Sequence, residues 1–348
     1  MSSSSTDQPT PAEYLPVLFG FAINQIGGVT SRLGIPDALA ASALTADELA
    51  TATGAHAGFL LRLLRAATTA GLLAVDAQGR FSLTVLGGMY RSDSPVQAAP
   101  LDAMHAAPAV WQAWGALEES VRTGKPAFNL VHGKGLFDHL GGDPELAGRF
   151  HAAMGAGSAV QLPAITRGFD FTGFGHVIDV GGGNGTHLAA ILAANPALRG
   201  TVFDTADGVL EAPGVLKDAG VADRCEITAG SFFDSVPAGA DGYLLKNILH
   251  DWDDASSKKI LDNIRSGLAR NGRVVVFSSV LSEGRQNEDP LEALGAAIFD
   301  IEMMVVTTGR ERTLTEFEQL FAASGLRLTK VTPLPCPFLY YALEAVAA

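Results

Sequence analysis

A glycine-rich stretch, DVGGGNG at residues 179–185, is the clearest chemical feature of this sequence. Because it lies between a short apolar run and a helical pattern, its glycines would let the backbone turn tightly and approach a ligand beside the unpaired N–H groups of a helix N-terminus. The spacing is not the G-x-G-x-x-G of a dinucleotide-binding loop, since the frame that begins at Gly181 ends at Thr186. A carboxylate at Asp179 would repel a pyrophosphate but can pair with the cationic amino group of a zwitterionic amino-acid tail, such as that of S-adenosylmethionine.

A second carboxylate, Asp204, lies nineteen residues beyond the last glycine, at the end of the next apolar run. At this place in a βαβ unit a carboxylate accepts two hydrogen bonds from a ribose diol, in nicotinamide and adenosyl cofactors alike. Asp204 by itself therefore does not separate these two classes, but the loop and the two acids together predict a ligand of this nucleotide type. A tight turn that binds nothing is the alternative.

His250 is the candidate general base, and a histidine that caps a strand–helix junction is the alternative interpretation. It falls at the end of the apolar segment 243–249, a predicted strand, and open α/β sheets bind ligands at the carboxyl ends of their strands. An imidazole with an ordinary pKa near 6.5 can take the proton of a phenol near 10 only if the transfer is coupled to nucleophilic attack. Asp251, Asp253 and Asp254 are interpreted as the acidic first turn of the next helix, with Asp253 as its N-cap. A metal site built from these four residues is disfavoured, because neighbours in sequence cannot all converge on one ion.

Alternating apolar runs and helical segments from residue 169 onward must position these side chains. Runs such as HVIDV, GTVFD and RVVVFSSVL predict strands that are buried on both faces of a parallel sheet. The predicted fold class is α/β, with a doubly wound sheet. Helices are expected at 290–306 and 314–324, followed by strands at 326–334 and 338–346.

Residues 12–92 predict a smaller, mostly helical domain. Thr45 is expected to cap a helix that ends at Gly54, a second helix follows, and residues 74–84 read as a two-stranded hairpin. Helix, turn, helix and hairpin in this order form a winged-helix arrangement, which serves DNA binding or dimerisation. Residues 1–110 carry five Arg, no Lys and eight acids, a balance of −3 that argues against docking on DNA.

The overall composition narrows the class of protein further. The 348-residue chain has 24 Lys and Arg against 37 Asp and Glu, a net charge of −13, so nucleic acid is not expected as a partner. Hydrophobic residues make up 47% of the chain, enough for two cores and a subunit interface. No apolar run reaches the ~18 residues of a membrane helix, and the two cysteines suit a reducing compartment, so a cytoplasmic protein is expected. Residues 1–11 are expected to be a disordered lead-in.

Six motifs together resemble those of the S-adenosylmethionine-dependent O-methyltransferases of the plant caffeic-acid and bacterial polyketide-tailoring type. They are DVGGGNG, GTVFD, GSFFDSVP, LLKNILHDWDD, GRERT and TEFEQLFAASG. The resemblance spans nearly the whole chain and implies a class I methyltransferase domain with an antiparallel last strand. It also implies a winged-helix-like domain that forms an intertwined homodimer. The expected division is a dimerisation domain at 12–108 and a methyltransferase domain at 109–348, with bridging helices at 109–165.

The same resemblance implies which residues hold the cofactor. The residues that would bind S-adenosylmethionine, and its product S-adenosylhomocysteine, are Asp179, Gly181, Gly183, Asp204, Ser231, Phe232 and Lys246. The two glycines would lie along the methionine tail and Asp204 would hold the ribose. The last three residues would surround the adenine.

For the chemistry, the resemblance implies metal-independent transfer with His250 as base and Glu311, within GRERT, as a carboxylate that orients the imidazole. The family's second orienting glutamate would lie on the strand at 273–281, where this chain has Ser278. A serine can donate or accept a hydrogen bond but cannot stabilise an imidazolium by charge. Glu302 either supplies the missing carboxylate, binds a polar group of the acceptor, or faces solvent from an amphipathic helix.

The acceptor would be a small aromatic or polyketide-like molecule with a hydroxyl group. Phe150, Met154 and Met303 would pack on its flat ring through apolar and thioether contacts. Two alternatives use the same fold: a C- or N-methyltransferase, and a non-methylating enzyme that retains the cofactor while catalysing hydroxylation or rearrangement. The pair of His250 and Glu311 favours methyl transfer over the non-methylating alternative.

Overall fold

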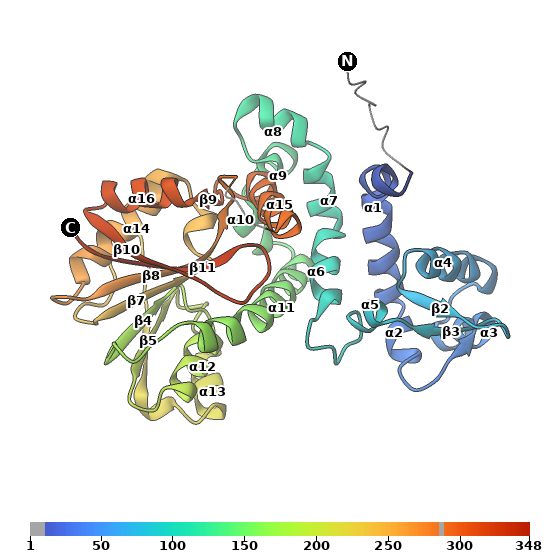
Figure 1. Ribbon diagram of the computed structural model, residues 1–348, viewed down its shortest axis with the longest axis horizontal. Helices are drawn as coiled ribbons and strands as arrows, with labels where there is room; N and C mark the ends of the chain where they lie inside the picture. The colour runs from blue at the N-terminus through green and yellow to red at the C-terminus, as the bar shows by residue number, and fades with distance from the viewer. Residues whose placement is uncertain (1–10, 285–288) are drawn as a thin grey trace, which may run out of the picture. The chain divides into compact units, whose positions relative to one another are not determined.

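The computed structural model describes residues 11–284 and 289–348, so the expected lead-in lies, except for Pro11, outside the described residues. The chain divides into two compact units (Figure 1). One comprises the chain up to Trp111 together with Leu140–Ala159, and the other comprises Gln112–His139 together with Val160–Ala348. Among the described residues, no helix is both long and apolar enough to cross a membrane.

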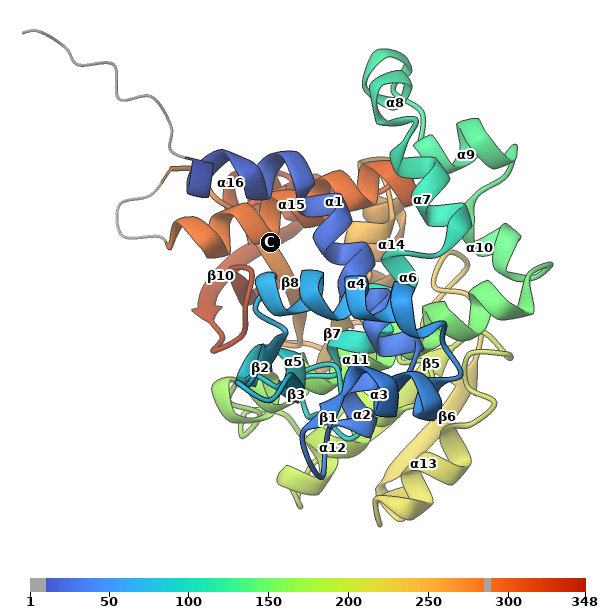
Figure 2. The same ribbon diagram turned by 90° about the vertical axis from the view of Figure 1, so that its right-hand side faces the viewer.

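The first unit is mostly helical. Its elements are α1 (Pro11–Arg32), α2 (Ile35–Ala38), β1 (Leu44–Thr45), α3 (Ala46–Thr53), α4 (Ala57–Thr69), β2 (Leu73–Val75), β3 (Arg80–Leu83), α5 (Val85–Gly88), α6 (Ala98–His105) and most of α7 (Pro108–Trp114). Figure 2 shows α3 and α4 beside the three short strands, whose order is β1-β3-β2. The predicted sequence of two helices and a hairpin is confirmed, with β1 as an added strand.

Local sequence explains the first of these helices. Thr45 accepts a hydrogen bond from the backbone N–H of Glu48, whose carboxylate accepts from the N–H of Thr45, so that the two form a capping box. Gly54 ends α3 in the left-handed region, with φ of 68°. Both predicted helix boundaries are therefore confirmed. The core of this unit consists of Ile35, Leu39, Leu49, Leu60, Leu64, Ala67, Leu72, Leu73 and Phe81.

The second unit alternates strands and helices after a helical entry. Its elements are α8 (Leu117–Thr123), α9 (Ala127–His132), α10 (Leu136–Leu140), the end of α11 (Pro144–Gly168), β4 (His176–Val180), α12 (Thr186–Ala194), β5 (Arg199–Asp204), α13 (Ala212–Asp218), β6 (Cys225–Ala229), β7 (Gly242–Lys246), α14 (Asp254–Gly267), β8 (Arg273–Leu281), α15 (Pro290–Val306), β9 (Arg312–Thr313), α16 (Leu314–Ala323), β10 (Leu326–Pro333) and β11 (Tyr340–Ala347). The helices and strands predicted after residue 289 are confirmed.

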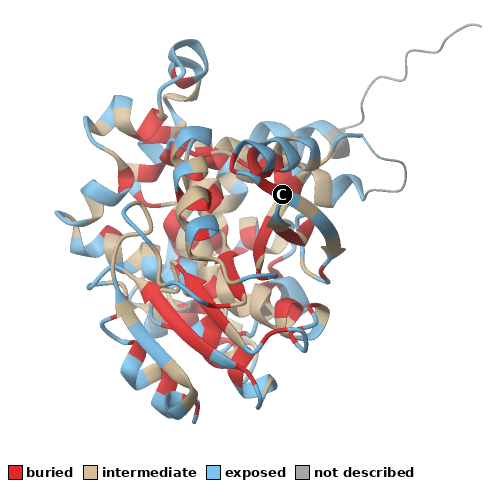
Figure 3. Ribbon diagram, turned by 90° about the vertical axis from the view of Figure 1, so that its left-hand side faces the viewer, coloured by how far each residue is buried: buried red, intermediate tan, exposed pale blue. Residues whose placement is uncertain are grey.

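The main sheet has the order β10-β11-β8-β7-β4-β5-β6, and β9 pairs with β8. The strands from β8 to β6 are parallel, whereas β11 is antiparallel to both of its neighbours. Alternate residues enter opposite cores: on β4, Val177 packs in the core that contains α12 and α13, and Ile178 in the core that contains α14 and α16. Figure 3 shows the buried strands between helices whose outer residues are exposed. The predicted doubly wound α/β class, with its antiparallel last strand, is confirmed.

One predicted boundary is wrong, and it matters for the site. The strand expected at 243–249 ends at Lys246, because Asn247 adopts a left-handed backbone with φ of 53°. His250 therefore lies in a short 3-10 turn, Leu249–Asp251, and not at the end of a strand. Three hydrogen bonds hold Asn247 in this unusual conformation: its N–H donates to Phe277 O, its side-chain amide donates to Gln161, and its side-chain oxygen accepts from Tyr340.

Candidate active site

The carboxyl ends of the parallel strands bring most of the predicted site residues to one edge of the sheet. Gly181 and Gly183 follow β4, Asp204 ends β5, Ser231 and Phe232 follow β6, Lys246 ends β7, and Ser278 lies in the second half of β8. In space the strands follow the order β8-β7-β4-β5-β6. The positions along this edge are therefore, in succession, Ser278, Lys246, the glycine loop, Asp204, and the pair Ser231 and Phe232. An elongated ligand lying across this edge would meet them in succession.

The glycine loop packs against the protein at one glycine and is open at another. Gly181 has φ of 73°, a conformation that favours glycine, and a Cβ there would lie 2.4 Å from Ile248 Cδ1 and would displace that side chain. Gly185, with φ of 78°, begins α12. Gly183, with φ of 52°, has no atom within 4 Å of where its Cβ would be. The loop is therefore closed against the protein at Gly181 and open at Gly183, which leaves room for a ligand to approach the backbone.

Asp204 is linked directly to this loop. Its Oδ2 accepts a hydrogen bond of 2.8 Å from the backbone N–H of Gly183, and its Oδ1 accepts from the N–H of Thr205. An ionised carboxylate has about four acceptor positions, so Asp204 keeps capacity for further donors such as a diol. One residue thus fixes the loop and presents acceptors beside it.

Two charged side chains, Asp179 and Lys246, lie near the carboxyl ends of the neighbouring strands β4 and β7. Asp179 is only 2% exposed, and its Oδ2 lies 3.4 Å from Nδ1 of His187, at the start of α12. Lys246 lies 3.5 Å from the side-chain oxygen of Gln161, on α11. Burial lowers the pKa of Lys246, and the charges of Asp179 and Asp251 oppose that effect only in part. A buried carboxylate and an ammonium group of lowered pKa therefore lie at the ends of β4 and β7.

Aromatic rings gather around the position expected for a planar base. Phe232 makes edge contacts with Phe233, at 4.9 Å between ring centroids, and with Trp252, at 6.1 Å. Phe137 stacks on Trp252 at 6.3 Å. The Ser231 hydroxyl accepts a hydrogen bond from the N–H of Phe233 and so fixes the turn in which Phe232 lies.

His250 and Glu311 form a close, buried pair. Nδ1 of His250 lies 2.7 Å from Oε1 of Glu311, and the two side chains are 16% and 2% exposed. Burial lowers the pKa of the imidazole, but the charges of Glu311 and Asp251 outweigh it and raise the pKa to about 9. Because the carboxylate fixes the proton on Nδ1, the neutral ring presents Nε2 as its acceptor.

The aspartates after His250 do not act alike. Asp253 caps α14 by accepting from the N–H of Ser256, as predicted, and Asp254 pairs with Arg312 at 2.7 Å. Asp251 was expected in the same helical turn, but it lies in the preceding 3-10 turn, with its Oδ1 3.7 Å from Nε2 of His250. Burial raises the pKa of Asp251, while the nearby imidazole opposes the shift. A second carboxylate therefore does face the imidazole.

Ser278 supports the first carboxylate and does not touch the ring. Its hydroxyl lies 3.5 Å from Oε2 of Glu311, and it is 2% exposed. The backbone N–H of Glu311 donates to Asp300, on α15, at 2.9 Å. Glu311 is thus held at its backbone by Asp300 and at Oε2 by Ser278, while its Oε1 contacts His250.

Glu302 occupies a buried position on α15. It is 9% exposed, and its carboxylate accepts a hydrogen bond of 2.8 Å from the indole N–H of Trp114. The solvent-facing interpretation of Glu302 is therefore wrong, because the apolar face of α15 packs inward at this residue. Met303, beside it, is 8% exposed.

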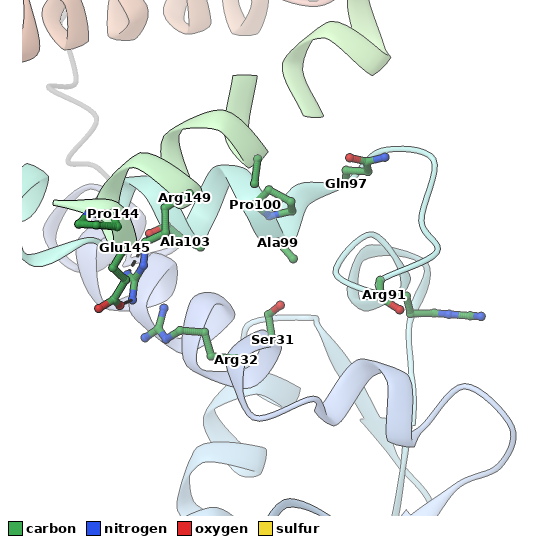
Figure 4. A pocket seen from close by; sticks show the side chains of 13 residues that line it. Ser31, Arg32, Arg91, Gln97, Ala99, Pro100, Ala103, Pro144, Glu145 and Arg149 are labelled. Carbon is green, nitrogen blue, oxygen red and sulfur yellow. Dashed lines mark hydrogen bonds and ion pairs between the residues drawn. The ribbon is translucent and has the colours of Figure 1, made fainter. Parts of the chain in front are cut away.

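The remaining predicted acceptor residues lie on the part of α11 that belongs to the first unit. Met154 is 49% exposed, and Phe150 contacts the ring of His151. A pocket of about 680 Å³ in the same unit is lined by neither of them. Figure 4 shows that the guanidinium groups of Arg32, Arg91 and Arg149 in this pocket point in different directions, and Arg149 pairs with Glu145. The pocket therefore has no converging set of charges.

Sequence reasoning missed several residues that shape the site, namely Gln161, Asn247, Asp251, Asp300, Arg312 and Tyr340. Asp251 has a signal, its adjacency to His250, but the pattern of three aspartates indicates the acidic first turn of the next helix instead. The others act through contacts between residues 11 to 93 positions apart in the chain, for which a single sequence has no signal.

Comparison with known proteins agrees with this geometry. A model of the O-methyltransferase domain matches residues 114–327, and a model of the O-methyltransferase dimerisation domain matches residues 15–93. The chain is 35% identical to O-demethylpuromycin-O-methyltransferase of Streptomyces alboniger, over 95% of this chain and 90% of that protein. It is 34% identical to 8-amino-8-demethylriboflavin N,N-dimethyltransferase of Streptomyces davaonensis, over 87% and 86%.

Among solved structures, an O-methyltransferase from neocarzinostatin biosynthesis superposes with a TM-score of 0.79 at 34% identity, covering 96% of this chain and 98% of that one. That structure is a complex with S-adenosylmethionine and 2-hydroxy-5-methyl naphthoic acid. Two domain models together match most of the chain, and relatives above 30% identity extend over nearly all of it. The chain therefore belongs to the O-methyltransferase family.

Proposed function

We propose that this chain transfers the methyl group of S-adenosylmethionine to a hydroxyl group of a small aromatic or polyketide-like molecule, with His250 as general base. The observation that carries the proposal is the 2.7 Å contact between His250 and Glu311, at the sheet edge that also carries the glycine loop and Asp204. Relatives that methylate aromatic hydroxyls support it.

The residues at this edge fit the cofactor. The open face of Gly183 admits a ligand to the backbone, and Asp204 has spare acceptors for the ribose. Asp179 supplies a buried negative charge for the amino group of the methionine tail, while Ser231, Phe232 and Lys246 surround the adenine. When bound, S-adenosylmethionine supplies an electrophilic methyl group on a cationic sulfur.

His250 acts on the acceptor's proton. Glu311 holds Nδ1–H, so Nε2 takes the hydroxyl proton as the oxygen attacks, and the resulting imidazolium lies against Glu311 and Asp251. A base whose pKa is about 9 is much closer to a phenol near 10 than an ordinary histidine is. Asp251 thus supplies the second carboxylate beside the imidazole, which the serine at position 278 cannot supply. Phe150, Met154, Glu302 and Met303 are proposed to contact the acceptor.

The direct test uses S-adenosylmethionine with an isotopically labelled methyl group and a panel of hydroxylated naphthoates, phenazines and benzoates. We expect the label to appear on an aromatic oxygen, identified by mass spectrometry and by loss of the free hydroxyl. Cofactor binding without transfer to any member of the panel would favour a non-methylating enzyme instead.

Replacing Asp204 with asparagine should weaken the binding of S-adenosylhomocysteine by roughly 10- to 100-fold, because hydrogen bonds to a charged acceptor contribute about 1.5–3 kcal/mol. The asparagine oxygen can still accept from Gly183, so the loop keeps its shape. Titration calorimetry measures the affinity. Asp207→Asn, an exposed carboxylate in the next turn, is the matched control and should bind normally. Equal affinities for both variants would remove Asp204 from the cofactor site.

An amine acceptor is the second candidate, because one relative of 34% identity is an N,N-dimethyltransferase. An aromatic amine attacks with a free lone pair and needs no base before attack. Aniline and phenol analogues of the same ring should therefore be compared. Methylation of the aniline alone, at a rate that is insensitive to His250→Gln, would favour the amine.

We also infer that the chain forms a homodimer through its first unit, with residues 12–108 as the dimerisation domain. Helix α1, within the matched dimerisation model, exposes a row of large apolar side chains: Val17 (83%), Leu18 (58%), Phe19 (51%) and Phe21 (58%). Such a surface is unfavourable in water unless it is covered. Gel filtration with light scattering should give twice the 36.1 kDa chain mass, whereas Phe21→Glu should shift the protein toward monomer.

A further inference from the structure

Arg312 is a fully buried arginine close to His250. It is 1% exposed and is the largest of the fully buried side chains in the described part of the chain. Its guanidinium donates to the carbonyl oxygens of Leu249, at 2.8 Å, and Trp252, at 3.0 Å. It also donates to the Asp254 carboxylate and to the Ser257 hydroxyl. A planar fork of five donors is suited to hold several acceptors in fixed directions.

The two carbonyls that Arg312 holds are those on either side of His250 and Asp251. The next residue back along the chain, Glu311, binds the imidazole ring itself. Consecutive residues thus hold the turn of one histidine in two ways: Glu311 binds the ring, and Arg312 binds the backbone carbonyls that flank His250 and Asp251. Strand β9 begins at Arg312, which pairs with Val280 of β8, directly after Glu311.

Gly309 closes the other side of the turn. A Cβ at this position would lie 1.8 Å from the carbonyl oxygen of His250 and 2.4 Å from the carbonyl carbon of Asp251. Neither atom belongs to a flexible side chain, so an alanine could be admitted only if the turn itself moved. The turn that contains His250 is therefore held by close backbone contact at Gly309 and by the hydrogen bonds of Arg312 to the carbonyls of Leu249 and Trp252.

We propose that Arg312, with Gly309, positions His250 so that its ring meets both Glu311 and the acceptor, and that this role is separate from cofactor binding. The inference rests on the proposed function of His250 as base. Arg312 touches neither reacting group, so it is a positioning residue. Its effect should pass entirely through His250.

Arg312→Lys keeps the charge and can still meet Asp254, but it cannot hold two carbonyls in a fork. We expect kcat to fall by about 10- to 100-fold, with the affinity for S-adenosylhomocysteine unchanged, because a misplaced catalytic group costs rate without costing binding. Arg273→Lys is the matched control: Arg273 also pairs with a buried carboxylate, Glu344, but at the start of β8. It should leave kcat near the wild-type value.

Two further variants separate the contacts. Gly309→Ala should reproduce the loss of kcat without changing any charge, whereas Gly214→Ala, in open space on α13, should not. Asp254→Asn leaves both carbonyl contacts of Arg312 in place and should lower kcat by less than about 3-fold. If Asp254→Asn were as slow as Arg312→Lys, Arg312 would act only as an ion-pair partner and the proposal would fail.

A double-mutant cycle and a direct titration complete the test. Arg312→Lys should cause no further loss in a His250→Gln background; an equal loss in both backgrounds would mean a general structural role. In ¹⁵N-histidine spectra, the imidazole of His250 should titrate at lower pH in Arg312→Lys than in the wild type, because Glu311 is no longer in contact. Should His250→Gln leave methyl transfer intact, the base role fails, yet the titration still decides whether Arg312 positions the ring. An unaltered titration would overturn the inference.

Discussion

His250→Gln is expected to slow O-methylation by roughly 10²- to 10⁴-fold, the usual contribution of a positioned general base. The glutamine can donate a hydrogen bond to Glu311 but cannot accept the hydroxyl proton at neutral pH. Cofactor affinity should be unchanged, because the glycine loop and Asp204 are untouched. Single-turnover transfer of a labelled methyl group to the best acceptor measures the step directly.

The matched control is His176→Gln, at the opposite edge of the sheet, where the histidine bonds only to the Thr201 hydroxyl among its side-chain contacts in the described structure. This variant should turn over normally. Near-wild-type transfer by His250→Gln would show instead that proximity and orientation of the two substrates supply the rate enhancement. A more acidic acceptor, already ionised at the assay pH, should rescue His250→Gln if proton removal is its defect.

Glu311→Gln is expected to change both the height and the pH dependence of the rate. In the wild type the raised pKa, about 9, means that the imidazole is mostly protonated at neutral pH, so the rate should rise as pH approaches 9. Without the carboxylate the pKa of His250 falls toward its ordinary value near 6.5, and the acid limb moves to lower pH. Above pH 9 the variant should still be slower by roughly 10²- to 10⁴-fold, because the imidazolium that forms lacks its main counter-charge and its fixed tautomer.

The same linkage predicts a stability effect with a definite sign. A group whose pKa is raised on folding stabilises the protein fully below its unfolded pKa, near 6.5, and this stabilisation is lost as pH rises through about 9. Urea denaturation of wild type and Glu311→Gln at pH 6 and pH 10 checks this: the difference in unfolding free energy should shrink at pH 10. A difference that is the same at both pH values would show that His250 is not charged in the folded protein. For the pH dependence of the rate, wild type and Glu311→Gln should be measured with the same acceptor. The ionisation of that acceptor then affects both rate profiles equally.

The fold and half of the site follow from local patterns in the sequence. The alternation of apolar runs predicts the parallel sheet because each central strand is buried on both faces, as Val177 and Ile178 illustrate. Thr45 and Asp253 predict helix starts because an N-cap acts within three residues. The glycine loop also has a local signal, since the φ of 73° at Gly181 favours glycine, whereas the Ile248 side chain that a Cβ there would meet comes from the distant segment after β7.

The geometry around the base could not be predicted in this way. The apolar pattern continues past Lys246, but the chain leaves the strand there because partners far away in sequence, Tyr340 and Gln161, stabilise Asn247 in a left-handed conformation. The same change of direction turns Asp251 toward the imidazole and not into the next helix. Such contacts form only in the folded tertiary structure, so local sequence preferences cannot predict them.

The bond between Asp300 and the backbone of Glu311 has a practical consequence for altering acceptor range. Directed evolution would first randomise α15, the helix proposed to face the acceptor. Yet a change at Asp300 would also loosen the residue that supports the base, so new specificity and lost turnover would arise from the same substitution. Libraries that hold Asp300 fixed and vary Glu302 and Met303 should keep these effects apart, and variants at Asp300 should be strongly epistatic with those at Glu311.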